Sequence, residues 1–158
     1  MTMLKAAVIL LVGFTACSNP TPSDSQTQKE DQTKHAMKNR VSIVEIPTAD
    51  FLRAVAFYQA ILGITIEVVE MEGIKMGLFP NENEGVTVQL ISGSDYKPSS
   101  DGTVVYLNGG DDLQTIVDKI EANRGKIIIP KTEIGPEMGF YAVFIDTEGN
   151  KLGLHSYK

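Results

Sequence analysis

From Val41 to the carboxyl end of the chain, short apolar runs follow one another in an order that occurs twice. In the first copy, residues 41–46 alternate β-branched residues with others, as a strand with one buried face does. A helix is predicted next, because Thr48 and Asp50 are candidate N-caps and Gly63 is a candidate C-cap. Its apolar stripe has helical spacing and consists of Phe51, Val55, Tyr58 and Leu62. Three more strands, separated by turn-forming residues, are predicted over residues 64–69, 74–79 and 86–91.

The second copy begins after a polar loop, residues 92–102, with a strand predicted over residues 103–107. A helix is predicted from Asp111 or Asp112 to Gly125, on an apolar stripe formed by Leu113, Ile116, Val117 and Ile120. Residues 131–139 are predicted to be a loop at the mouth of this half. The remaining strands are predicted over residues 126–130, 140–146 and 151–157, the last two joined by a hairpin turn at residues 146–150.

Each copy has the order strand, helix, strand, strand, strand. The chain is therefore predicted to be an α+β protein with two βαβββ modules, residues 41–91 and 103–158, which form a curved mixed sheet around a concave pocket for a small molecule. Roughly 120 residues suffice for one packed core. The 20 acidic residues against 14 Lys and Arg, a formal charge of -6, argue against a nucleic-acid partner.

The first 40 residues differ in composition from the rest. Residues 1–16 have the arrangement of an export signal, since Lys5 precedes an apolar run that is too short to span a bilayer. Phe14-Thr15-Ala16-Cys17 resembles the lipobox of bacterial lipoproteins, which implies cleavage before Cys17 and lipid on its thiol. An ordinary cleaved secretion signal that contains a cysteine is the alternative.

Residues 17–40 are rich in Ser, Thr, Pro, Gln and charged residues, so they are predicted to be a flexible tether. The lipid would hold the domain close to a membrane. The predicted location is therefore the cell envelope, at the outer membrane or on the periplasmic face.

Two motifs in the domain resemble the vicinal oxygen chelate superfamily, the group of glyoxalase I, bleomycin-resistance proteins and extradiol dioxygenases. The first is the run of residues 46–58 followed by Ile61-Leu62-Gly63. The second is residues 144–154, where a strand, an Asp-x-x-Gly-Asn turn and a last strand occur together. The resemblance covers residues 41–158 and implies a glyoxalase-like fold, although a fold alone does not define an activity.

Metal-using members of that superfamily hold a divalent ion with His or Glu from the first and fourth strands of one module and the first and last strands of the other. The resemblance places these positions at Ile43 or Val41, Gln89, residues 103–105, and Gly153. Such residues are poor ligands for these ions, so no metal and no other cofactor is expected. A divalent metal at a shifted site that uses Glu45 and His155 is the alternative.

Strand alternation and the predicted loop point to several side chains that line the pocket. Glu45 and His155 are the candidate catalytic residues, as acid and base. The candidate ligand-binding residues are Gln89, Tyr106, Lys151 and Met138. For each of them, an ordinary structural role is the alternative.

Three functions are compatible with these features. The first is a metal-free protein that binds a small molecule in the cell envelope. The second is a lyase or isomerase that uses Glu45 or His155, with or without a displaced metal. The third is a non-catalytic interaction module. The resemblance also implies a homodimer.

Overall fold

The structure, a computed structural model, describes residues 40–81 and 85–158. The predicted export signal, Cys17 and all but the last residue of the tether lie outside these residues. The first half consists of β1 (Ile43–Pro47), α2 (Phe51–Leu62), β2 (Glu67–Met71), β3 (Ile74–Leu78) and β4 (Thr87–Ser92). The second half consists of β5 (Tyr106–Asn108), α3 (Gln114–Ile120), a short 3₁₀ helix (Glu121–Asn123), β6 (Lys126–Gly135), β7 (Gly139–Ile145) and β8 (Lys151–Ser156).

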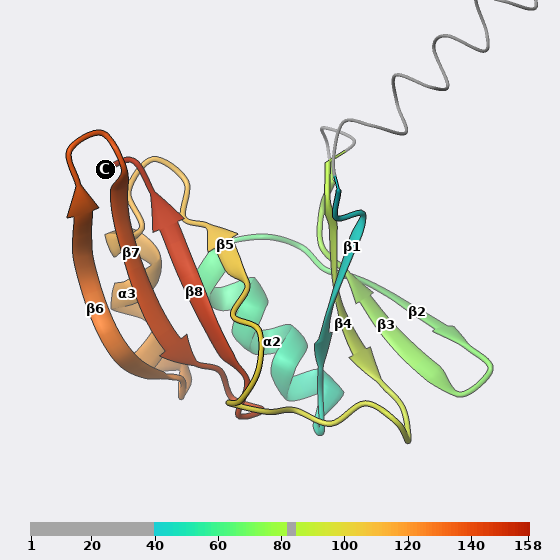
Figure 1. Ribbon diagram of the computed structural model, residues 1–158. Coiled ribbons are helices and arrows are strands. Elements are labelled where there is room, and N and C mark those ends of the chain that lie inside the picture. Colours follow the sequence, from blue (N-terminus) through green and yellow to red (C-terminus); the bar gives the residue numbers. More distant parts are fainter. Residues whose placement is uncertain (1–39, 82–84) are drawn as a thin grey trace, which may run out of the picture. The chain divides into compact units, whose positions relative to one another are not determined.

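The strands form two four-stranded mixed sheets of the same design, which confirms the predicted α+β class and the doubled βαβββ order. One sheet has the order β1-β4-β3-β2 and the other the order β5-β8-β7-β6. In each, the first strand of the half runs parallel to the last, and the other pairs are antiparallel. Figure 1 shows β1 and β5 as the edges that the two sheets turn toward each other.

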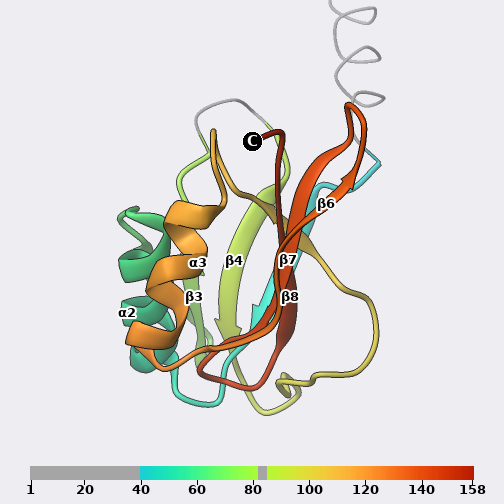
Figure 2. The same cartoon turned by 90° about the vertical axis from the view of Figure 1, so that its left-hand side faces the viewer.

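Both helices lie on the same side of the sheets (Figure 2) and cover one continuous apolar core. The predicted caps of α2 are confirmed: the Asp50 side chain accepts a hydrogen bond from the Arg53 amide, and Gly63 adopts a left-handed conformation with φ of 68°. Tyr58 and Ile61 of this helix are fully buried, as are Leu90 of β4 and Phe144 of β7. None of the helices in the described residues is long and apolar enough to cross a membrane.

Three segments differ from their predictions. The strand predicted over residues 64–69 lies at Glu67–Met71, and the strand predicted over residues 103–107 lies at Tyr106–Asn108. Strand β6 continues to Gly135, so residues 131–135 are strand and not loop. The β6–β7 pairing shifts register between Ile129 and Thr132, on either side of Pro130. Because proline has no amide hydrogen, a bulge at this point lets the strand pass it and continue.

The buried carboxylate of Asp146 joins the two halves. Its Oδ1 accepts hydrogen bonds from the amides of Glu148, Gly149 and Asn150 at 2.9, 2.9 and 2.8 Å. Its Oδ2 accepts from the Tyr58 hydroxyl of α2 at 2.8 Å and from the Asn150 side chain at 2.9 Å. Burial and the neighbouring Asp146 carboxylate both raise the pKa of Tyr58 well above its ordinary value, so the hydroxyl stays protonated and donates.

The same hairpin turn contacts the start of α2. Glu148 accepts hydrogen bonds from the amides of Ala49 and Asp50, at 3.0 and 2.7 Å, and from Arg53 Nε at 2.8 Å. Asn150 Nδ2 also donates to the Pro47 carbonyl at 2.8 Å. We call residues 146–150 with these partners the interhalf clasp. It explains why the Asp-x-x-Gly-Asn turn of the second half occurs together with the helix motif of the first.

We predict that the interhalf clasp makes stability depend on pH through Glu148. Burial alone raises the pKa of this carboxyl group, but hydrogen bonds from Arg53, from the Thr147 hydroxyl and from the amides of Asp50 and Ala49 outweigh burial and lower it. A lowered pKa in the folded state means that the stabilisation is complete above the ordinary glutamate value and is lost as the pH falls through the lowered pKa. Glu148→Gln should reduce the free energy of unfolding at pH 7 by about 1–2 kcal/mol.

Urea unfolding between pH 7 and pH 3 measures this effect. The wild-type protein should lose more stability over the acidic range than Glu148→Gln does. Glu67→Gln, which removes an exposed carboxylate from β2, is the matched control and should follow the wild-type curve. Parallel curves for the wild type and Glu148→Gln would contradict the prediction.

Candidate functional site

Glu45 and Gln89 are neighbours across the parallel pair β1–β4 and are in register with each other. Gln89 Nε2 donates a hydrogen bond to Glu45 Oε1 at 2.9 Å. Gln89 is only 8% exposed, whereas Glu45 is exposed. The register therefore places Glu45 beside Gln89, and Ile43 lies two residues away, beside Thr87.

Tyr106 and Gly153 occupy the corresponding places across the parallel pair β5–β8. The Tyr106 ring lies so close over Gly153 that a Cβ atom added to the glycine would be 2.2 Å from ring atom Cδ1. Tyr106 is 49% exposed. Its ring thus covers β8 at a point where no other side chain fits.

The His155 side chain contacts the backbone of Met138. His155 Nε2 lies 2.9 Å from the Met138 carbonyl oxygen, and because a carbonyl oxygen only accepts, this nitrogen is the donor. The imidazole also stands edge-on to Tyr157, with 5.3 Å between ring centroids. The Met138 side chain is exposed.

Lys151 and Glu45 line the same small cavity of about 180 Å³, between β1 and the start of β8, together with Lys97, Ser99 and Asp101. Gln89, Tyr106, His155 and Met138 are not among the residues that line it. The structure therefore brings the predicted site residues together in pairs, and this cavity holds only two of them.

These positions do not provide the donor set that a divalent metal requires. Glu45 is the only carboxylate among the two in-register pairs, one of its oxygens accepts from the Gln89 amide, and Gly153 has no side chain. Divalent ions in such sites are held by several carboxylate or imidazole ligands. Within residues 40–81 and 85–158, no group of three or more His, Cys, Asp or Glu side chains converges as metal ligands do. The residues present do not fit the ion that metal-using relatives hold.

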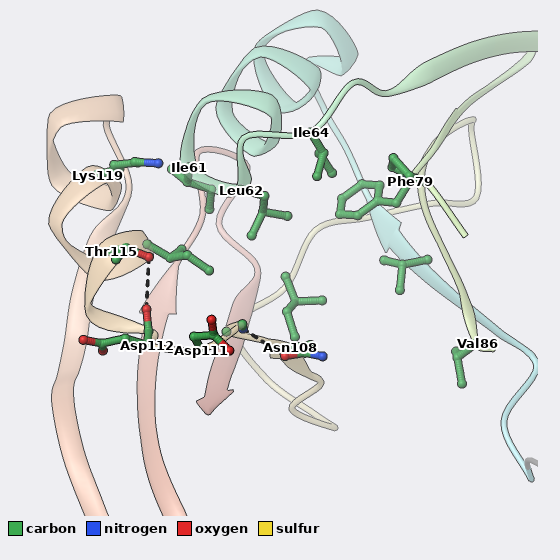
Figure 3. Close-up of a pocket in the computed structure, with 16 residues that line it drawn as sticks. Ile61, Leu62, Ile64, Phe79, Val86, Asn108, Asp111, Asp112, Thr115 and Lys119 are labelled. Carbon is green, nitrogen blue, oxygen red and sulfur yellow. Dashed lines mark hydrogen bonds between the residues drawn. The ribbon is translucent and has the colours of Figure 1, made fainter. Parts of the chain in front are cut away.

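A larger pocket, of about 510 Å³, lies on the helix side of the sheets (Figure 3). It separates the end of α2 and the start of α3 from β4 and the segment that follows β3, with β5 at its base. Most of its wall is apolar and consists of Ile61, Leu62, Ile64, Phe79, Val86, Val88, Leu107 and Ile116. Asn108, Asp111, Asp112, Thr115 and Lys119 add polar groups.

Hydrogen bonds hold the loop between β5 and α3 in place. The Gly109 amide donates to the His155 carbonyl at 2.7 Å, and the Gly110 amide donates to Asn108 Oδ1 at 2.9 Å. Asp112 Oδ1 accepts from the Gln114 amide at 2.9 Å and pairs with Lys131 Nζ at 2.7 Å. The hydrogen bond from Lys131 is the main cause that lowers the pKa of Asp112.

Sequence reasoning did not find this pocket. None of the six predicted catalytic and ligand-binding residues lines it. Its apolar residues have the spacing of buried helix and strand faces, so they are indistinguishable from core in the sequence. Only the polar run of residues 108–112, directly before a helix, was a signal for a loop beside a ligand.

The fold and these residues define an α+β domain of two βαβββ modules with an apolar pocket between its halves. The chain belongs to the family described as Glyoxalase/Bleomycin resistance protein/Dioxygenase superfamily, whose sequence profile matches residues 34–154.

Relatives of this chain include a glyoxylase-like domain-containing protein from Didymella fabae, which is 31% identical over 124 residues, 72% of this chain and 91% of that one. A mutant of glyoxalase I from Zea mays superposes with a TM-score of 0.56 at 15% identity, over 73% of this chain. The chain spans only 45% of the length of that maize protein. A mutant of the fosfomycin resistance protein FosX from Listeria monocytogenes, solved with Mn(II) and a dihydroxypropylphosphonic acid, superposes with a TM-score of 0.56 at 17% identity, covering 76% of this chain and 94% of that one.

We predict that Gly153→Ala destabilises the protein because its new methyl group requires the Tyr106 ring to move. The expected loss is about 1–3 kcal/mol of the free energy of unfolding, measured in urea. Adding Tyr106→Ala should remove much of the effect of the alanine at position 153, which a double-mutant cycle detects as coupling. The matched control is Gly85→Ala, since the nearest atom to a Cβ there is 4.0 Å away. Additive effects of the two substitutions would contradict the contact.

Proposed function

We propose that this domain binds a small molecule in the pocket of about 510 Å³ and does so without the divalent metal of its metal-using relatives. The observation that carries the proposal is the pocket itself. Its volume is within the range of about 300–1,000 Å³ that is typical of sites for small ligands. Mostly apolar walls with a few polar groups are also typical of such sites.

The lack of a fitting donor set at Glu45, Gln89, Tyr106 and Gly153 supports the metal-free part of the proposal. Two contacts within the protein occupy these positions. They are the hydrogen bond from Gln89 to Glu45 and the packing of the Tyr106 ring over Gly153.

An enzymatic function with Glu45 or His155 as acid and base is less well supported. One ring nitrogen of His155 is engaged with the Met138 carbonyl, and one carboxylate oxygen of Glu45 accepts from Gln89. Neither residue lines the larger pocket. A general acid or base has to be within hydrogen-bond reach of the substrate, so a ligand in that pocket would not contact them.

We further propose that the protein is anchored in the cell envelope by lipid on Cys17. The support is the sequence of residues 1–17, in which a positive charge, a short apolar run and small residues precede the only cysteine.

Filling the pocket should block binding. Val86 lines the pocket, and Val68 is an exposed valine on β2 that is not among the pocket-lining residues. With 2-naphthalenemethanol as a neutral apolar probe, we expect Val86→Trp to weaken binding by at least about tenfold and Val68→Trp to leave it unchanged. Isothermal titration calorimetry measures the two dissociation constants. Equal weakening by both variants, or none by Val86→Trp, would place binding elsewhere.

Lipid attachment predicts a change in partitioning. The full-length protein, expressed in a bacterium that processes lipoproteins, should enter the detergent phase on Triton X-114 separation, because covalent lipid adds roughly 0.8 kcal/mol per buried methylene group. Cys17→Ala should move the protein to the aqueous phase. Aqueous partitioning of both proteins would support the alternative of an ordinary secretion signal.

A further inference from the structure

We infer that the ligand of the 510 Å³ pocket is an amphipathic molecule with an apolar body and one basic, positively charged nitrogen, and that Asp111 is the counter-ion of that nitrogen. This inference rests on the proposed function. It adds the chemical class of the ligand.

The apolar part follows from the walls of the pocket. Eight aliphatic or aromatic side chains from α2, α3, β4, β5 and the adjoining segments line it, including Ile61, Phe79 and Ile116. An uncharged ring or chain gains from contact with such a surface in rough proportion to the area removed from water. A small, fully polar ligand would leave these side chains in contact with water, so their burial would add no binding free energy.

The positive charge of the ligand is inferred from two neighbouring aspartates, of which only Asp112 has an ion-pair partner among the described residues. The Asp112 carboxylate is already paired with Lys131 at 2.7 Å. Figure 3 shows it turned away from the apolar wall, whereas Asp111 lies between Asp112 and Asn108 at the base of the pocket. Among the described residues, no cationic side chain lies within ion-pair distance of Asp111. Asp111 is exposed, so its charge is available to a ligand that enters the pocket from solvent.

The backbone on either side of Asp111 is held by hydrogen bonds. The loop that carries it is fixed on both sides by the hydrogen bonds of Gly109, Gly110 and Asp112. A short side chain on a fixed loop loses little conformational entropy when it pairs with a ligand.

Lys119 is the other unpaired charge among the lining residues, and it favours an anion less than Asp111 favours a cation. It lies on the exposed side of α3, near Ile61 and away from Asp111 in Figure 3. Its ammonium group is strongly hydrated and sits on a flexible stem, so fixing it on a ligand requires both desolvation and ordering.

Three probes with the same ring test the inference: 2-naphthylmethylammonium, 2-naphthalenemethanol and 2-naphthoate, which are cationic, neutral and anionic at pH 7. Calorimetric titration of the full-length protein should show the cation binding about tenfold more tightly than the neutral probe, and the anion more weakly than either. Asp111→Asn, which keeps the shape of the side chain, should abolish the preference for the cation and leave the affinity for the neutral probe unchanged.

Asp95→Asn removes an exposed carboxylate from a loop that does not line the pocket, so it is the matched control and should keep the preference. Equal affinities for cation and neutral probe in the wild type would overturn the inference, and so would a preference for the anion that Lys119→Gln removes. Both results leave the pocket as the site. Failure of the proposed function is a separate outcome: no probe binds, or Val86→Trp does not affect binding of the neutral probe.

Discussion

The buried carboxylate of Asp146 is the interaction on which the arrangement of the two halves depends. It accepts five hydrogen bonds, three from the backbone of its own turn and two from the side chains of Asn150 and Tyr58. A buried carboxylate without such partners would be strongly unfavourable, so the turn and the Tyr58 hydroxyl have to be in place together. Because Tyr58 belongs to the first half and Asp146 to the second, this requirement fixes α2 against the second sheet. The pocket between the halves then has a defined wall on each side.

Two in-register pairs lie across the parallel strands at the facing edges of the two sheets. Glu45 faces Gln89 on one sheet, and Tyr106 faces Gly153 on the other. Each pair makes a contact that is complete without an ion, a hydrogen bond in the first case and a ring on a glycine in the second. The family is established by the sequence profile that matches residues 34–154, while the chemistry has to be argued from the side chains of this chain.

Much of the fold was predictable because its signals are local. The stripe from Phe51 to Leu62, the cap at Asp50 and the left-handed Gly63 each depend on residues within one or two turns of helix. The continuation of β6 past Pro130 was not predictable in this way, since it depends on pairing with β7 across a bulge. The contact of Tyr106 with Gly153 likewise joins residues that are far apart in the chain.

The candidate site was harder to predict than the fold. Alternation placed Glu45 and Gln89 on one face, and their hydrogen bond agrees with that placement. It did not show that His155 contacts the Met138 carbonyl or that Lys151 shares a cavity with Glu45, because both depend on how the second sheet curves. The larger pocket depends on the separation of α2 and α3 from β4 and the segment that follows β3, a distance that no spacing along the chain encodes.

We expect the pocket to bind its ligand without a metal ion. The direct measurement is calorimetric titration of the naphthyl probe into protein stripped with chelator, repeated after addition of zinc, nickel, manganese or iron. Metal-free binding predicts one dissociation constant for all samples and no ion retained at one per chain after dialysis. Retention of one ion per chain, together with probe binding that appears only in its presence, would contradict it.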